Sequence, residues 1–164
     1  MMPALDNSSQ SWPARRVICV GAVVLRENKA LLIRQVKGAS LEGQWSIPWG
    51  IVETEEFPSS AAVRETLEEG GVTAEIEGLL GIQNLSWENS IGIIYLCRHV
   101  AGEPLADGGV ETDQAAYLSL DEIEELNEPI EPWCEWIVKR VLRNEHHLIP
   151  SEPNNPYQPK PAFL

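Results

Sequence analysis

The sequence has no apolar run of membrane-spanning length, and its first residues show no basic-then-apolar signal pattern. A membrane helix needs about 20 mostly apolar residues, and a secretory signal needs a basic start followed by an apolar segment. These absences argue against a membrane-embedded transporter and against a secreted protein. We therefore expect a soluble, cytoplasmic protein with no membrane partner.

Cysteine and histidine are also scarce. The three cysteines, at positions 19, 97 and 134, are an odd number and show neither C-x-x-C nor metal-like spacing. Cys19 and Cys97 fall in apolar, strand-like runs, where buried free thiols are common. The three histidines form no recognisable ligand or triad pattern. Nothing in these residues indicates a disulfide framework, a zinc site or a histidine-based active site.

Cations are few relative to anions. The chain has 12 Lys and Arg against 25 Asp and Glu, which gives a net charge of −13. Such a charge argues against nucleic acid or an anionic membrane as the partner. It would also repel a phosphorylated substrate, unless bound cations invert the local potential. The charge is consistent with a metal site.

The length and composition predict one folded domain. A chain of 164 residues that is 43% hydrophobic can bury a full core. We divide it into a loose N-terminal lead-in (1–13), a domain (14–146) and a Pro-rich, irregular C-terminal tail (147–164). No internal repeats are present.

Hydrophobic patterning within the domain predicts mostly strands, with three helices. The strands are expected at 16–26, 30–36, 72–76, 79–85, 91–100 and 115–118. The helices are expected at 58–69, 120–126 and 131–144. The last helix should place four residues on an apolar face: Trp133, Trp136, Ile137 and Val141.

The stretch 50–72 contains the helix that matters most. Pro58 suits a first helical position, and Gly70-Gly71 suits a C-terminal cap. At about 100° per residue, Glu65, Glu68 and Glu69 share one face. The other side, expected to pack on a sheet, carries Val63, Thr66, Leu67 and Gly70.

Clustered carboxylates destabilise a helix unless something offsets their charge. Hard divalent cations bind oxygen ligands and offset it well. An ordinary solvated acidic face is the alternative in so acidic a chain.

The same stretch carries a long motif that decides between these readings. Gly50, Glu56, Arg64-Glu65, Glu68-Glu69 and Gly71-Val72 fill the pattern G-x5-E-x7-R-E-U-x-E-E-x-G-U, where U is bulky and apolar. This pattern resembles the Nudix box. Thr66 departs from the usual aliphatic residue. Before the box, Trp49 stands where many relatives of this family have glycine.

The resemblance implies a fold and an activity. The fold is α+β, a three-layer α/β/α sandwich with a mixed β-sheet. The activity is Mg²⁺-dependent hydrolysis of a nucleoside diphosphate linked to another moiety, with Mn²⁺ as a substitute cation. Substrates of this kind include ADP-ribose, nucleotide sugars and nucleoside triphosphates. The partner is therefore expected to be a small molecule.

The resemblance also implies roles for the box residues. The metal ligands are the carbonyl of Gly50 and the carboxylates of Glu65, Glu68 and Glu69. Arg64 is expected to brace the site by pairing with a carboxylate such as Glu56.

The general base is left open between three sources. It is a box glutamate (Glu65 or Glu68), or Glu111 from the loop before the 115–118 strand, with Asp113 as a competing candidate in that loop.

Substrate contacts are the least specific part of the interpretation. Arg34 and Lys37 are candidates for phosphate, and Trp49 and Trp87 for stacking on a base; ordinary surface charge and packing explain them equally well. Extra signatures that mark particular substrates outside the box are missing.

Two further alternatives follow from the same residues. One is a Nudix-like nucleotide-binding or regulatory module, although such a module is free to lose the acids that this chain keeps. The other is a homodimer, in which Tyr157, Phe163 or Leu164 of the tail docks on a partner copy.

Overall fold

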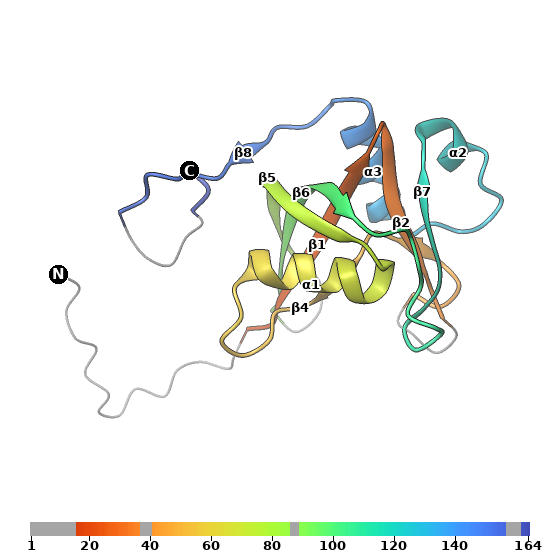
Figure 1. The fold of residues 1–164 in the computed structure, drawn as a ribbon, viewed down its shortest axis with the longest axis horizontal. Helices are drawn as coiled ribbons and strands as arrows, with labels where there is room; N and C mark the ends of the chain where they lie inside the picture. The colour runs from red at the N-terminus through yellow and green to blue at the C-terminus, as the bar shows by residue number, and fades with distance from the viewer. Residues whose placement is uncertain (1–15, 37–40, 86–88, 157–161) are drawn as a thin grey trace.

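A mixed β-sheet forms the middle of the protein, with helices on both of its faces (Figure 1). The computed structural model describes residues 16–36, 41–85, 89–156 and 162–164. The strands are β1 (Ile18–Arg26), β2 (Lys29–Gln35), β3 (Trp45–Ser46), β4 (Trp49–Ile51), β5 (Thr73–Asn84), β6 (Ile91–Ala101), β7 (Thr112–Leu118) and β8 (Ile149–Pro150). The helices are α1 (Pro58–Gly70), α2 (Leu120–Glu124) and α3 (Pro132–Leu142).

Strand β1 lies at the centre of the sheet. It runs parallel to β6 along most of its length and antiparallel to both β2 and β4. The order of the strands is β3-β2-β1-β6-β5-β8, with β4 paired to β1 and β7 paired to β2. The predicted mixed sheet is confirmed.

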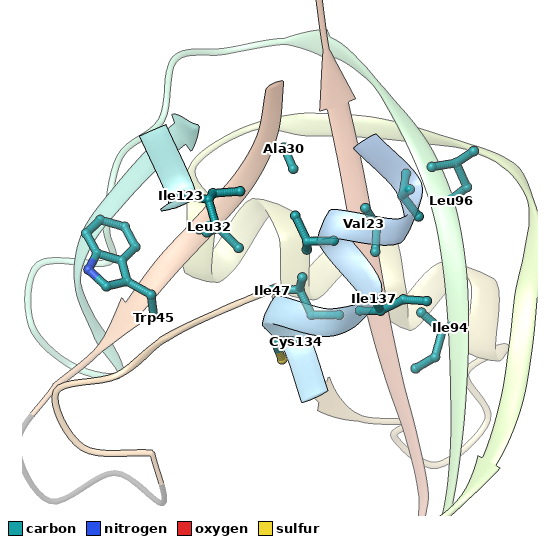
Figure 2. Close-up of a cluster of buried hydrophobic side chains, with 12 residues drawn as sticks. Val23, Ala30, Leu32, Trp45, Ile47, Ile94, Leu96, Ile123, Cys134 and Ile137 are labelled. Carbon is teal, nitrogen blue, oxygen red and sulfur yellow. The ribbon is translucent and has the colours of Figure 1, made fainter. Parts of the chain in front are cut away.

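Alternation along β1 produces two cores, one on each face of the sheet. Val20, Ala22 and Val24 pack with Ala61 and Ala62 of α1. On the opposite face, the core contains Val23 of β1, Ile94 of β6, Ile137 and Val138 of α3, and Ile47 from the segment between β3 and β4. Figure 2 shows α3 lying across this second core. The predicted three-layer arrangement is therefore confirmed, and so is the burial of the free thiols of Cys19 and Cys97.

Strand β5 differs from its prediction. The sequence indicated two strands, 72–76 and 79–85, whereas β5 is continuous from Thr73 to Asn84. Its register against β6 shifts between Ile76 and Gly78 and between Leu79 and Gly81. These bulges let one long strand follow β6, and they break the two-residue periodicity that a sequence pattern depends on.

Two large side chains were placed on the wrong side of their helices. Leu67 of α1 is 52% exposed and Trp136 of α3 is 53% exposed. Helix α1 buries Glu65 and Glu69 in place of Leu67. In α3, the buried positions are Cys134, Ile137, Val138 and Val141, and Trp136 instead lies under the guanidinium of Arg140.

The C-terminal tail is more ordered than predicted. Ile149 and Pro150 pair with Leu79 and Gly78 of β5 as strand β8. The ring of Phe163 packs against Tyr95 of the same chain, with 5.4 Å between ring centroids. Phe163 therefore docks on its own domain, where the sequence suggested a partner copy. Tyr157 lies outside the described residues.

Among the helices that the structure describes, none combines the length and apolar character required to cross a membrane.

Phe163→Ala should weaken the domain because it removes the ring that covers Tyr95. We expect the free energy of unfolding to fall by about 2 kcal/mol, less than the roughly 3–5 kcal/mol typical of a fully buried phenylalanine. Urea denaturation measures this change. Leu164→Ala is the matched control: its side chain is 86% exposed, so its effect should stay within about 0.5 kcal/mol. Equal effects of the two substitutions would show that the tail does not stabilise the domain.

Candidate active site

Helix α1 is fixed against the sheet by small residues. Thr66 is fully buried and returns its hydroxyl to the carbonyl oxygen of Ala62, at 2.8 Å. A β-carbon at Gly70 would lie 2.8 Å from Leu31 Cδ2, so glycine permits this close approach. Gly71 then ends the helix in the left-handed conformation, with φ of 72°. Thr66, the departure from the box pattern, therefore fits its buried position with its hydroxyl hydrogen-bonded.

Strand β4 lies directly against the carboxylate of Glu65. A β-carbon at Gly50 would come within 1.9 Å of Glu65 Oε1. Any larger residue at position 50 would force this carboxylate to move. The structure thus gives a physical reason for the first glycine of the box.

Glu69 is the most deeply buried acid of the site, at 2% exposure. The backbone N–H of Trp49 donates to its Oε2 at 2.8 Å, and Gln35 Nε2 lies 3.5 Å from its Oε1. Burial, and then the negative charges of Glu65 and Glu111, raise the pKa of Glu69 to about 8. Burial also raises the pKa of Glu65, which is 8% exposed.

Glu68 does not share this environment, because its side chain is 58% exposed. The three box acids thus face the same region of the molecule from very different depths.

Arg64 braces the acids. It donates to both carboxylate oxygens of Glu56, at 2.9 and 3.0 Å, which is the pairing that the sequence predicted. The same guanidinium donates to Glu65 Oε1 at 2.8 Å, to Glu68 Oε2 at 3.0 Å and to the carbonyl oxygen of Ile51 at 3.1 Å. The Arg64 guanidinium also lowers the pKa of Glu56. One side chain therefore ties the loop after β4 to the acidic face of α1.

The donor set of this region is made of oxygen atoms: the carboxylates of Glu65, Glu68 and Glu69 and the backbone at Gly50. Oxygen donors of this kind suit Mg²⁺ or Mn²⁺. Within the described residues, no three acidic, histidine or cysteine side chains already converge as a metal cluster. Arg64 bonds only one oxygen of each of two acids, Glu65 Oε1 and Glu68 Oε2. The residue types fit a divalent cation, and the second oxygens of Glu65 and Glu68 make no bond to Arg64.

Glu111 approaches the box acids from the connection between β6 and β7. Its charge contributes to the raised pKa of both Glu65 and Glu69. Its carbonyl oxygen accepts from the N–H of Val36 at 2.9 Å, and its side chain is exposed. The next residue, Thr112, bonds to the carbonyl oxygen of Glu69, so the segment that carries Glu111 lies against the last turn of α1.

Two residues that the sequence reading missed hold this connection in place. The carboxylate of Asp107 accepts four backbone N–H groups, from residues 109, 110, 111 and 112. The fully buried hydroxyl of Thr112 donates to the carbonyl oxygen of Glu69 at 3.0 Å. An Asp followed by two glycines is a turn signal that could have pointed to Asp107.

The other loop acid, Asp113, is bound elsewhere. Arg34 donates to Asp113 at 2.8 and 3.0 Å and to Glu128 at 2.6 Å. Arg34 thus links β2, β7 and the segment before α3. This arrangement favours the structural role for Arg34 and weakens both the phosphate role and the case for Asp113 as the base. Lys37, the other phosphate candidate, and Trp87 lie outside the described residues.

A cavity of about 570 Å³ is lined in part by Trp49, whose backbone N–H bonds Glu69. Its lining is mostly apolar: Leu41, Ser46, Trp49, Gln83, Leu85, Glu131, Trp133 and Cys134. The indoles of Trp49 and Trp133 meet edge to face, with 5.9 Å between ring centroids. The hydroxyl of Ser46 is fully buried and has no hydrogen-bond partner among the described residues.

Trp49 fits its position because two strand glycines make room for it. A β-carbon at Gly21 would lie 2.5 Å from its indole, and one at Gly92 would lie 2.9 Å from it. Glycine inside an otherwise apolar strand often marks such a close approach. Trp49 therefore has the packing role that the sequence offered as one reading, and its indole also forms a wall of the cavity.

Comparison with known proteins identifies the family. A model described as "NUDIX domain" matches residues 15–137. A MutT-like protein of Streptomyces ambofaciens is 26% identical, covering 73% of each chain. An ADP-ribose pyrophosphatase of Methanocaldococcus jannaschii is 28% identical, covering 66% of this chain and 65% of that protein. Human diphosphoinositol polyphosphate phosphohydrolase 2 is 40% identical, over 50% of this chain and 46% of its own length. The chain thus spans less than two thirds of the last two relatives.

Solved structures give the same fold. A NUDIX hydrolase from Nitrosomonas europaea superposes with a TM-score of 0.70 at 24% identity, covering 80% of this chain and 72% of that one. The family model covers most of the chain, and the box acids lie on one face of α1, so the two observations identify the same family. The chain belongs to the Nudix hydrolases, a family of pyrophosphohydrolases that act on phosphoanhydride bonds.

Proposed function

We propose that this protein hydrolyses a nucleoside diphosphate linked to another moiety, with Mg²⁺ as its cation and Mn²⁺ as a substitute. The observation that carries the proposal is the pair of buried acids, Glu65 and Glu69, held between α1 and β4. Burying two carboxylates costs free energy unless charge is compensated. The fold does not need two buried carboxylates for its stability. A bound cation, in contrast, would compensate their charge and be held by them.

The metal ligands in this proposal are Glu65, Glu68, Glu69 and the carbonyl of Gly50. A bound divalent cation would acidify a water molecule and offset negative charge on the leaving phosphate. Arg64 keeps Glu65 and Glu68 aligned, and its own charge reduces the repulsion between them.

We assign proton abstraction from the attacking water to Glu111. Its neighbour Thr112 bonds to the carbonyl oxygen of Glu69, and the charge of Glu111 contributes to the raised pKa of Glu65 and Glu69, whereas Asp113 is held by Arg34. A carboxylate that faces both solvent and the acids can accept a proton there and release it afterwards.

We place the base of the substrate in the cavity beside Trp49. Two aromatic walls suit a flat ring, and the Gln83 side chain offers a polar contact along the lining. The cavity volume lies within the usual range of small-molecule sites. The N–H of Trp49 binds Glu69, a proposed metal ligand, while its indole would contact the base. Trp49 would therefore lie between the base and the diphosphate.

The similarity to an ADP-ribose pyrophosphatase supports ADP-ribose as the first compound to test. The alternative is a Nudix-like module that binds a nucleotide without cleaving it.

Hydrolysis by the full chain should therefore depend on both cation and substrate. We would measure product release from ADP-ribose, UDP-sugars, dinucleoside polyphosphates and nucleoside triphosphates with Mg²⁺, with Mn²⁺ and with EDTA. At least one compound should be cleaved with either cation and none with EDTA. Nucleotide binding without turnover across the panel would establish the binding-module alternative instead.

Gly50→Ala should weaken cation binding while leaving the fold intact. The new methyl group would overlap the carboxylate of Glu65, which must then turn away. We expect Mn²⁺ affinity to fall at least about tenfold, as is typical when metal ligands are disturbed, and isothermal titration calorimetry measures it. Gly81→Ala is the matched control, because a β-carbon there meets nothing within 4 Å. Unchanged Mn²⁺ affinity in Gly50→Ala would contradict the metal assignment.

Trp49→Ala should raise KM for substrates that carry a base. Loss of one stacking wall typically costs about 1–3 kcal/mol, so KM should rise roughly tenfold with kcat little changed. A diphosphate that lacks a base, such as 5-phosphoribosyl diphosphate, should show no such rise. Trp136→Ala controls for loss of an indole, because Trp136 is half exposed and lies outside this cavity. An equal rise for both kinds of substrate would place the base elsewhere.

A further inference from the structure

The connection between β6 and β7 is built around one carboxylate. Asp107 Oδ1 accepts the N–H groups of Gly109 at 3.1 Å, Val110 at 3.0 Å and Thr112 at 3.1 Å. Its other oxygen, Oδ2, accepts the N–H of Glu111 alone, at 2.7 Å. An ionised acceptor makes shorter and stronger hydrogen bonds than a neutral one. The shortest of the four bonds is therefore the one that fixes the backbone of Glu111.

The same connection is attached to the end of the box helix. Thr112 Oγ1 donates to the carbonyl oxygen of Glu69 at 3.0 Å and accepts the N–H of Asp107 at 3.1 Å. Leu105 donates its N–H to the carbonyl oxygen of Gly70, also at 3.0 Å. Carbonyl groups in the last turn of a helix lack partners within the helix. Here the connection supplies those partners, so its position is fixed relative to the turn that carries Glu69.

The backbone leaves little freedom at this junction. A β-carbon at Gly71 would lie 2.7 Å from the carbonyl oxygen of Leu105. The N–H of Val36 holds the carbonyl oxygen of Glu111 from the side of β2. Glu111 is thus fixed through its N–H by Asp107 and through its carbonyl oxygen by Val36.

We propose that Asp107 is a positioning residue: its carboxylate, anchored to the box helix through Thr112, holds the Glu111 side chain in register with Glu65 and Glu69. The catalytic part of this inference rests on the proposed function, in which Glu111 accepts the proton. Asp107 itself contacts neither substrate nor cation in this scheme. Its fourfold bonding to the backbone is more than an exposed turn requires, since such turns usually close with one or two bonds.

Asp107→Asn tests this inference at a single atom. Asparagine can keep its oxygen at the Oδ1 position and retain three of the four bonds. Its NH₂ group then replaces Oδ2 and faces the N–H of Glu111, donor against donor. The substitution therefore releases Glu111 specifically while leaving the rest of the turn bonded.

Amide hydrogen exchange gives a readout without catalysis. Asp107→Asn should raise the exchange rate of the Glu111 amide at least tenfold, with strands β1 and β6 unchanged. Glu103→Gln is the matched control. It also removes a charge from this connection, but Glu103 pairs with Arg26, so exchange of the Glu111 amide should stay unchanged. Unchanged exchange at Glu111 would overturn the proposal.

A double-mutant cycle tests whether Asp107 acts through Glu111. With the substrate that the panel identifies, Asp107→Asn should lower kcat about 10- to 100-fold, as small misplacements of catalytic groups do, with KM within about twofold. In a Glu111→Gln background it should cause no further loss of kcat. An equal loss in both backgrounds would show that Asp107 does not work through Glu111. If the panel yields no substrate, the proposed function fails, while the exchange experiment still decides whether Asp107 holds Glu111.

Discussion

The burial of two carboxylates beneath strand β4 is the constraint on which the rest of the site depends. Glu65 and Glu69 point toward the sheet, where an acid is costly and an aliphatic residue would be ordinary. Three neighbouring residues accommodate the buried carboxylates or compensate their charge. Gly50 leaves space for one carboxylate, the N–H of Trp49 binds the other, and Arg64 supplies the positive charge. Gly50, Arg64 and the backbone of Trp49 therefore each contribute to holding the two acids at buried positions.

The same constraint explains why the end of the helix matters as much as its face. Glu69 is in the last turn of α1, so its position depends on how that turn is closed. Closure comes from Gly71 in the left-handed conformation and from the bonds of Leu105 and Thr112 to the last carbonyl groups. A loop far along the sequence therefore completes the helix and, in the same contacts, is itself fixed near the acids.

The sequence predicted what depends on local spacing. The helix at 58–69 and the central strand follow from short-range patterns, and the structure bears them out. The pairing of Arg64 with Glu56 was implied by the resemblance to the Nudix box, and the structure contains it. The failures have a common physical origin. Leu67 and Trp136 are exposed because helix rotation was set by what α1 and α3 must bury, which periodicity alone does not reveal. Likewise, β8 pairs with β5, a contact between segments about 70 residues apart that local patterning does not reveal. Asp107 precedes two glycines, which signals a turn, but its bonds to four backbone N–H groups appear only in the fold.

Trp49 shows how a departure from a family pattern can be accommodated. An indole where many relatives have glycine needs space, and Gly21 and Gly92 on the neighbouring strands provide it. Its backbone still binds Glu69, as any non-proline residue would, so the substitution leaves the acids undisturbed. The side chain of Trp49 lines the cavity, whereas its backbone N–H holds Glu69. In the proposed function, recognition of the base and positioning of a catalytic acid would therefore use different atoms of one residue, so a change of side chain at position 49 need not disturb Glu69.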